Sequence, residues 1–107
     1  MSQDLKEKLE QAVKLLVEAC HPERIILFGS QARGTEDERS DIDIMVVEKN
    51  VASKADEIVR LCRVLAPLGL GVDLVVVDET AFDYWKETPG TVHYEALTEG
   101  KTLYEAA

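Results

Sequence analysis

The feature that most constrains this chain is a Gly-Ser pair followed, ten residues later, by an Asp-x-Asp pair. Gly29 and Ser30 end an apolar run, and Asp41 and Asp43 open the next one. Because alternate side chains of a strand point to the same side, the two aspartates are expected to share a face, with Cα atoms about 6.6 Å apart. Two carboxylates this close repel each other unless a cation lies between them. Hard oxygen ligands suit Mg²⁺, so the pair predicts a magnesium site.

The Gly-Ser pair supplies groups of the opposite polarity. At a strand end that leads into a helix, free backbone N–H groups and a hydroxyl are well suited to bind phosphate. Gly29 would let the backbone approach the phosphates closely, Ser30 would donate its hydroxyl, and Arg33, about one helical turn further on, is a further candidate for phosphate contact. The alternative is a plain tight turn with a helix cap, and a turn residue at Asp41. Together the two pairs predict a site for Mg²⁺ and a nucleoside triphosphate.

Length and composition indicate one domain over residues 1–107, since 46% of the residues are hydrophobic, as in typical globular domains. No apolar run approaches the ~18 residues that span a bilayer, and the N-terminus has no signal-peptide pattern, which favours a cytoplasmic protein without membrane contact. Cys20 and Cys62 are far apart in the sequence and are expected to be buried and reduced. His21 and His93 lack the spacing of zinc ligands, so zinc is not expected.

The chain is acidic, with 12 basic and 21 acidic residues and a net charge of −9. This balance lacks the basic surface with which proteins bind a nucleic-acid backbone, so direct binding to nucleic acid is not expected. An acidic surface fits a basic protein partner, because complementary potentials speed encounter. The alternative is that the charge serves solubility alone.

The spacing of apolar residues and the positions of Pro and Gly predict a mixed α/β chain. Helices are expected at residues 4–20, 52–66, 81–87 and 91–98, strands at 25–28, 41–47 and 72–77, and residues 101–104 can add a small edge strand. A brief helix is expected to begin over residues 31–33, before a polar loop over 34–40. The aromatic residues Phe82, Tyr84 and Trp85 are expected to serve the core or a partner interface, with stacking on adenine the less favoured alternative.

Several residues mark helix ends or faces. Ser53 and Asp56 form a capping pair for the second long helix, and Pro89 is expected to open the last helix. The face of the helix over residues 52–66 that is expected to be buried carries Ala55, Ile58, Val59, Cys62, Leu65 and Ala66.

The Gly-Ser pair, the Asp-x-Asp pair and a third aspartate, Asp73, on a later apolar run resemble the nucleotidyltransferase superfamily of DNA polymerase β type. The short chain resembles the minimal nucleotidyltransferases of prokaryotes, many of which are antitoxins paired with a HEPN-domain toxin. The resemblance covers nearly the whole chain and implies a nucleotidyltransferase fold, in which a small mixed sheet is flanked by helices.

The resemblance also implies roles. Asp41 and Asp43 would bridge two Mg²⁺ ions, and Asp73 would complete the ligands of the catalytic ion. Gly29 and Ser30 would bind the phosphates of ATP. The implied activity moves AMP from ATP to a hydroxyl, a tyrosine of the HEPN toxin, with release of pyrophosphate.

Strand connections test this reading independently. The short connection between the first two strands favours their antiparallel pairing. The long helix between the second and third strands favours a parallel, right-handed crossover. The end of the first strand and the starts of the other two would then meet at one edge of the sheet. Gly29, Ser30, Asp41, Asp43 and Asp73 are therefore expected to converge.

Other functions remain as alternatives at this point. One is an antitoxin that neutralises its partner by contact alone, although idle clustered carboxylates would cost stability. Another is a small-molecule nucleotidyltransferase whose substrate domain comes from a second chain. A phosphoacceptor receiver domain is disfavoured, because it lacks the Gly-Ser element and needs five strands. The acceptor, the nucleotide, the number of AMP units transferred and the homo- or hetero-oligomeric state are left open by the sequence.

Overall fold

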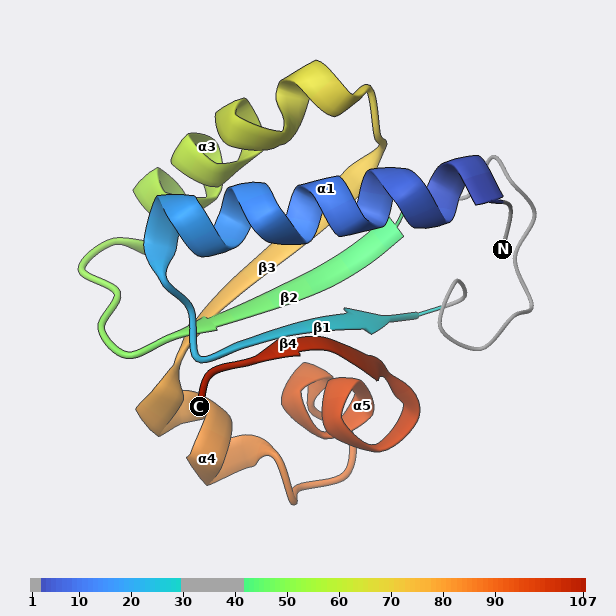
Figure 1. Ribbon diagram of the computed structural model, residues 1–107. Helices are drawn as coiled ribbons and strands as arrows, with labels where there is room; N and C mark the ends of the chain where they lie inside the picture. The colour runs from blue at the N-terminus through green and yellow to red at the C-terminus, as the bar shows by residue number, and fades with distance from the viewer. Residues whose placement is uncertain (1–2, 30–41) are drawn as a thin grey trace.

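The computed structural model describes residues 3–29 and 42–107, which form a mixed sheet with helices on both sides (Figure 1). The strands are β1 (Arg24–Phe28), β2 (Ile42–Glu48), β3 (Val72–Asp78) and β4 (Lys101–Glu105). The helices are α1 (Gln3–Cys20), α3 (Lys54–Leu65), the short 3-10 helix η1 (Ala66–Leu68), α4 (Glu79–Trp85) and α5 (Val92–Glu99). The strand order in the sheet is β3-β2-β1-β4.

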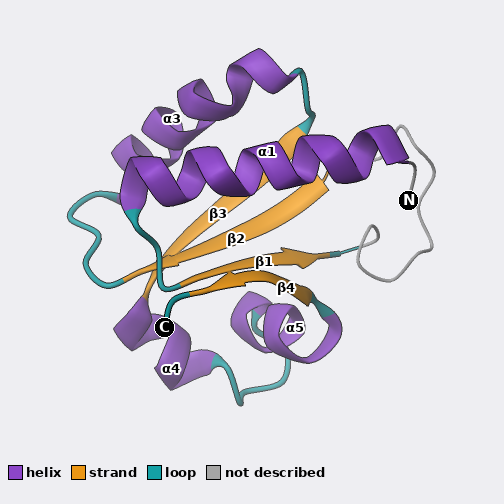
Figure 2. Cartoon of the chain, viewed as in Figure 1, coloured by secondary structure: helices purple, strands orange, loops and turns teal. Residues whose placement is uncertain are grey.

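The sheet topology agrees with the one expected from the connections. β1 pairs antiparallel with β2 and with β4, while β2 and β3 are parallel and are joined through α3. The helices α1 and α3 cover one face of the sheet, and α4 and α5 cover the other (Figures 1 and 2). The predicted α/β fold is confirmed, and the end of β1 lies at the same edge as the starts of β2 and β3.

Two hydrophobic cores fill the spaces between the sheet and its helices, and β2 contributes to both. Ile44 and Val46 belong to the core under α1 and α3, whereas Met45 and Val47 belong to the core under α4 and α5. This alternation follows from the two-residue period of a strand. Asp43 therefore shares the sheet face of Met45 and Val47.

Hydrogen bonds at the helix starts confirm one expected cap and correct another expectation. The Ser53 side chain accepts a hydrogen bond of 3.3 Å from the Asp56 amide and caps α3, as expected. Thr91 caps α5 by accepting from the Tyr94 amide at 3.1 Å. The prediction that Pro89 opens this helix is wrong, because a threonine two residues later satisfies the free N–H groups of the first turn.

The buried face of α3 is narrower than expected. Leu61 and Leu65 are buried against the sheet and α1, and Ile58 packs at their margin. Val59 is 50% exposed, and Ala55, Cys62 and Ala66 are exposed as well, so the prediction that these four residues are buried is wrong. The apolar stripe of this amphipathic helix is wider than the surface that α1 and the sheet can cover. Both cysteines are free thiols, and Cys20 is partly buried, as described further below.

Part of the predicted structure falls outside the described residues. The brief helix expected over residues 31–33 and the loop over 34–40 lie there, together with Ser30 and Asp41. Within residues 3–29 and 42–107, no helix combines the length and the apolar character needed to cross a membrane.

Candidate active site

Two aspartates meet at the edge of the sheet where β2 and β3 begin. Asp43 and Asp73 are direct partners in the parallel register of these strands, one position after the first pair, Ile42 and Val72. Neighbouring strands lie about 4.8 Å apart, and paired residues in a parallel ladder project to the same face. Asp43 is half-buried and Asp73 is exposed. The two carboxylates are therefore side by side at an edge that solutes can reach.

The turn that follows β1 lies against this pair. Phe28, the last residue of β1, is the antiparallel partner of Asp43, and Gly29 comes next. The φ angle of Gly29 is 74°, in the left-handed region that favours glycine. A Cβ atom added to Gly29 would also collide with Oδ2 of Asp43. Residue 29 is thus restricted to glycine both by its backbone conformation and by the carboxylate beside it.

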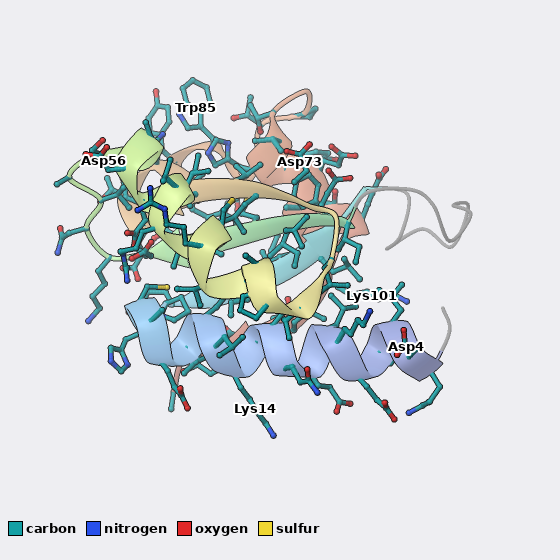
Figure 3. All side chains as sticks on the ribbon, turned by 90° about the horizontal axis from the view of Figure 1, so that it is seen from above. Asp4, Lys14, Asp56, Asp73, Trp85 and Lys101 are labelled. Carbon is teal, nitrogen blue, oxygen red and sulfur yellow. The ribbon has the colours of Figure 1, made fainter. Side chains whose placement is uncertain are left out.

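The structure therefore brings together three of the six residues that the sequence assigned to the site. Gly29, Asp43 and Asp73 lie at one edge of the sheet, as the strand connections predicted. Figure 3 shows Asp73 well apart from Asp56, which lies in the first turn of α3, whereas Asp73 lies at the start of β3. Ser30, Arg33 and Asp41 lie outside the described residues, and their roles stay predictions.

The chemistry of this pair fits a hard divalent cation. Two carboxylates on adjacent strands offer oxygen donors on the same side of the sheet, and their negative charges repel in the absence of a counter-charge. Mg²⁺ is bound in proteins through one or two carboxylates together with substrate phosphates and water. The glycine turn beside Asp43 removes the side chain that would otherwise fill the space next to the carboxylate. These observations meet the chemical requirements of a magnesium–nucleotide site.

The aromatic residues of α4 lie away from this edge. Phe82 is 1% exposed and belongs to the core under α4 and α5, so its expected core role is confirmed. Tyr84 and Trp85 are 72% and 42% exposed and contact each other edge to face, with ring centroids 4.7 Å apart. The helix α4 begins after the end of β3, about 16 Å along the strand from Asp73. This arrangement argues against stacking of Tyr84 or Trp85 on a base bound beside Asp73.

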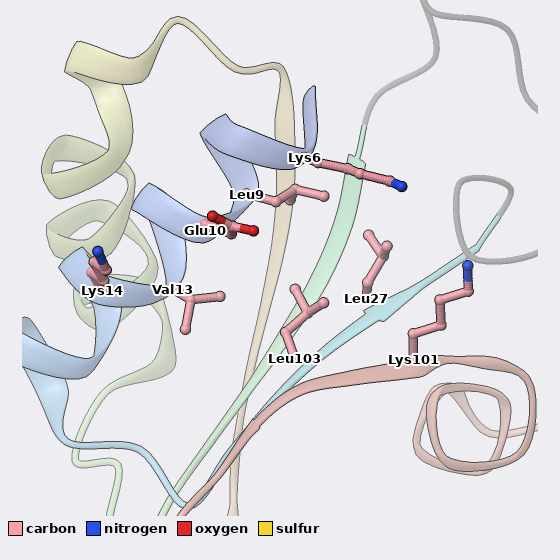
Figure 4. Close-up of a pocket in the computed structure, with 8 residues that line it drawn as sticks. All are labelled: Lys6, Leu9, Glu10, Val13, Lys14, Leu27, Lys101 and Leu103. Carbon is pink, nitrogen blue, oxygen red and sulfur yellow. The ribbon is translucent and has the colours of Figure 1, made fainter. Parts of the chain in front are cut away.

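A groove that sequence reasoning did not find lies between α1 and the β4 edge of the sheet. Its volume is about 510 Å³, and its apolar lining comes from Leu9, Val13, Leu27 and Leu103. Figure 4 shows these side chains between helix and sheet, with lysines from α1 and β4 at the margins. The apolar spacing of the first helix predicted a buried stripe. That spacing does not show that the sheet leaves part of the stripe uncovered.

The chain belongs to the family described as "Polymerase beta, Nucleotidyltransferase", whose model matches residues 10–107. This membership confirms the predicted family and the prediction that the chain is an enzyme of the nucleotidyltransferase class.

Similar proteins are found among archaeal sequences and solved structures. A protein of Methanocaldococcus jannaschii named "Putative protein adenylyltransferase MJ0604" is 35% identical over 102 residues, which cover 89% of this chain and 97% of that protein. A crystal structure of a toxin–antitoxin with AMP-PNP superposes with a TM-score of 0.67 at 26% identity, covering 98% of this chain and 75% of that one.

A third structure, tri-AMPylated Shewanella oneidensis HEPN toxin in complex with MNT antitoxin, has a TM-score of 0.61 at 24% identity. The match covers 94% of this chain and 72% of that one. At this identity the match shows a common fold, and it agrees with the fold expected from the sequence.

Proposed function

We propose that the protein is a Mg²⁺-dependent protein adenylyltransferase that moves AMP from ATP to a hydroxyl of a partner protein. The acceptor in this proposal is a tyrosine of a HEPN-domain toxin, and the modification silences the toxin. Support comes from the family, from the name of the M. jannaschii relative, and from the similarity to a toxin–antitoxin structure with AMP-PNP. The whole chain, residues 1–107, would act as one cytoplasmic domain.

The observation that carries the proposal is the register of Asp43 with Asp73, with Gly29 against the Asp43 carboxylate. Two adjacent carboxylates repel each other, and a divalent cation bound between them would relieve that repulsion. Glycine at residue 29 keeps that carboxylate accessible to a ligand. Like charges gathered at one accessible edge are typical of functional sites, where activity and stability are often in conflict.

Each site residue has a role in the proposed reaction. Asp41, Asp43 and Asp73 would hold two Mg²⁺ ions, which when bound stabilise negative charge on the attacking and leaving oxygens. The backbone at Gly29 and the hydroxyl of Ser30 would donate hydrogen bonds to the phosphates and orient ATP. Arg33 would add a positive charge near the phosphates.

The proposed reaction replaces a P–O bond of ATP with a P–O bond to the acceptor. The acceptor hydroxyl loses its proton and its oxygen attacks the α-phosphorus of ATP. The bond between the α-phosphorus and the bridging oxygen breaks, and pyrophosphate leaves. The net charge of −9 supports a protein acceptor with a basic surface and disfavours nucleic acid as the acceptor.

ATP carrying a label on either the α- or the γ-phosphate distinguishes the reactions. The chain is mixed with Mg²⁺, labelled ATP and a HEPN-domain protein from the same organism as the partner. We expect the α-label on the partner, no γ-label, and loss of labelling with Asp43→Asn. Transfer of the γ-label would mean phosphoryl transfer and would refute the proposal.

The same experiment separates the two alternatives. A tight complex with an unlabelled partner would favour an antitoxin that acts by contact alone. Labelling of an added aminoglycoside instead of the partner would favour a small-molecule nucleotidyltransferase.

A further inference from the structure

A second cluster of chemically reactive side chains lies away from the candidate active site. It combines Cys20, the last residue of α1, with Glu48, the last residue of β2, and Glu57 in the first turn of α3. One ligand atom of each lies within 4.8 Å of the other two. The three residues are distant in the sequence and meet only because the fold joins the ends of these elements.

Glu48 is the most unusual member of this cluster. The residue is only 7% exposed, and it follows Val46 by two positions on β2, which places it on the sheet face covered by α1 and α3. Within the described part of the chain, its buried Oε2 atom has no hydrogen-bond partner. A buried carboxylate oxygen without a partner costs free energy, so its presence calls for a further ligand.

The other two members are held in place by neighbouring groups. Arg60 donates to both oxygens of Glu57, at 2.8 Å each, and its third nitrogen donates to the Ala19 carbonyl at 2.9 Å. The Cys20 thiol donates to the Leu16 carbonyl at 3.2 Å, which leaves the sulfur lone pairs available. Arg60 therefore ties the end of α1 to the start of α3 around the cluster.

This cluster is separate from the proposed nucleotide site. Glu48 lies five residues after Asp43 on β2, a distance of about 16 Å along the strand. The two side chains also point to opposite faces of the sheet, since their positions differ by an odd number. A ligand at the cluster is therefore out of contact with Asp43 and Asp73.

We propose that Cys20, Glu48 and Glu57 form a binding site for Zn²⁺ that joins α1, β2 and α3. A thiolate with two carboxylates suits Zn²⁺, whereas Mg²⁺ prefers oxygen ligands alone. Zn–S and Zn–O bonds of about 2.3 and 2.0–2.2 Å place tetrahedral donor atoms about 3.3–3.6 Å apart. Because the donor atoms already lie within 4.8 Å of one another, side-chain rotations that shorten these separations by at most about 1.5 Å reach that geometry, with water as the fourth ligand. Arg60 would then orient Glu57 from outside the site.

The charges of the cluster agree with this assignment. Burial, followed by the negative charges of Glu48 and Glu57, raises the pKa of Cys20 to about 12. Burial and the neighbouring Glu57 raise the pKa of Glu48 to about 8. Both groups therefore keep a proton at neutral pH, and Zn²⁺ would take the place of these two protons, with charge conserved.

Titration of the full chain with ZnCl₂, in an excess of Mg²⁺, tests the site. We expect binding of one Zn²⁺ per chain, and a loss of affinity of at least about 10- to 100-fold in Cys20→Ser and in Glu48→Gln. Co²⁺ in place of Zn²⁺ should give a thiolate-to-metal charge-transfer absorption that disappears in Cys20→Ser. This absorption reports ligation by sulfur whether or not a variant alters stability.

Two controls come from the same chain. Cys62→Ser removes the exposed thiol, and Asp43→Asn alters the proposed nucleotide site, so both should bind Zn²⁺ as the wild type does. Equal affinity of the wild type and Cys20→Ser, or a loss confined to Cys62→Ser or Asp43→Asn, would overturn the proposal. Absence of the Co²⁺–thiolate absorption in the folded wild type would overturn it as well. The cluster would then be a protonated Glu48 carboxyl beside a Glu57 carboxylate held by Arg60.

Discussion

Asp43 and Asp73 are register partners on two parallel strands, so their carboxylates leave the sheet side by side on the face covered by α4 and α5. The relationship results from the topology, since α3 returns the chain to start β3 beside the start of β2. The antiparallel β1 then ends at the same edge and places Gly29 against Asp43. A site made from three separate segments thus depends on one crossover and one short connection.

Replacing Asp43 with Asn should separate a metal site from a structural use of the carboxylate. If the pair is held for Mg²⁺, the variant should be as stable as the wild type in EDTA, or more stable, because a repulsion is removed. Adenylyl transfer should fall by orders of magnitude. Mg²⁺-ATP at about 100 times its Kd should stabilise the wild type by about 2.7 kcal/mol and the variant much less. Thermal melts with and without Mg²⁺-ATP measure the stability of each protein and its stabilisation by the ligand.

Asp56→Asn is the matched control, because Asp56 is an exposed aspartate in the first turn of α3, apart from Asp73 at the start of β3 (Figure 3). It should keep both the activity and the response to Mg²⁺-ATP. An Asp43→Asn protein that is clearly less stable than the wild type in EDTA, with an unchanged response to Mg²⁺-ATP, would contradict the assignment.

Gly29→Ala should damage the site more than its backbone conformation alone explains. A left-handed residue other than glycine costs about 1–2 kcal/mol, and the new Cβ would in addition displace the Asp43 carboxylate. Gly69 offers a direct comparison, since its φ is 67° and an added Cβ would meet nothing within 4 Å. Gly69→Ala should lose stability and keep its activity, whereas Gly29→Ala should lose both. Equal activities of the two variants would mean that the turn after β1 does not bind phosphate.

The sequence predicted the parts of the fold whose signals are local. Spacing and turn chemistry over a few residues predicted the capping of α3 by Ser53. They also predicted β2, which carries Asp43, and β3, whose second residue is Asp73. The edge at which Gly29, Asp43 and Asp73 meet followed from connection lengths. Local periodicity and chirality rules were sufficient for this part of the site.

What the sequence could not predict depends on contacts between distant elements. Cys62 and Val59 have the spacing of a buried stripe but are exposed, whereas α1 and the sheet cover Leu65, which was expected, and Leu61, which was not. Cys20 and Glu48 show no ligand spacing in the sequence, and only the packing of α1 against α3 and the sheet brings them together. Such features require the relative placement of helices, which apolar periodicity does not fix.

Alanine substitutions in α4 should show that Phe82 stabilises the core and that Tyr84 does not. Phe82 is 1% exposed, so Phe82→Ala should destabilise the protein by about 3–5 kcal/mol. Tyr84→Ala removes an exposed ring that contacts the Trp85 ring edge to face, and it should cost at most about 1.5 kcal/mol. The affinity for ATP should be unchanged in Tyr84→Ala, as measured by titration. A marked loss of ATP affinity in this variant would show that the ring stacks on the base.

The buried carboxyl of Glu48 should make the metal-free protein less stable as the pH rises. Burial and Glu57 raise its pKa in the folded protein from 4.5 to about 8. Below about pH 4.5 both the folded and the unfolded chain bind this proton, and the full contribution to stability is present. Between about 4.5 and 8 only the folded chain keeps the proton, so the free energy of unfolding falls by up to about 1.4 kcal/mol per pH unit.

Glu48→Gln removes this titration and should flatten the dependence. Denaturant unfolding in EDTA at about pH 5 and about pH 8 should therefore show the variant gaining stability relative to the wild type at the higher pH. The pKa of Glu57 is shifted in the opposite direction, because hydrogen bonds from Arg60 lower it. Its titration therefore affects stability only below about pH 4.5, outside the range between pH 5 and pH 8. Glu87→Gln, at an exposed position after α4, should follow the wild type at both values. A wild type and a Glu48→Gln variant with parallel pH profiles would show that Glu48 carries no proton in the folded protein.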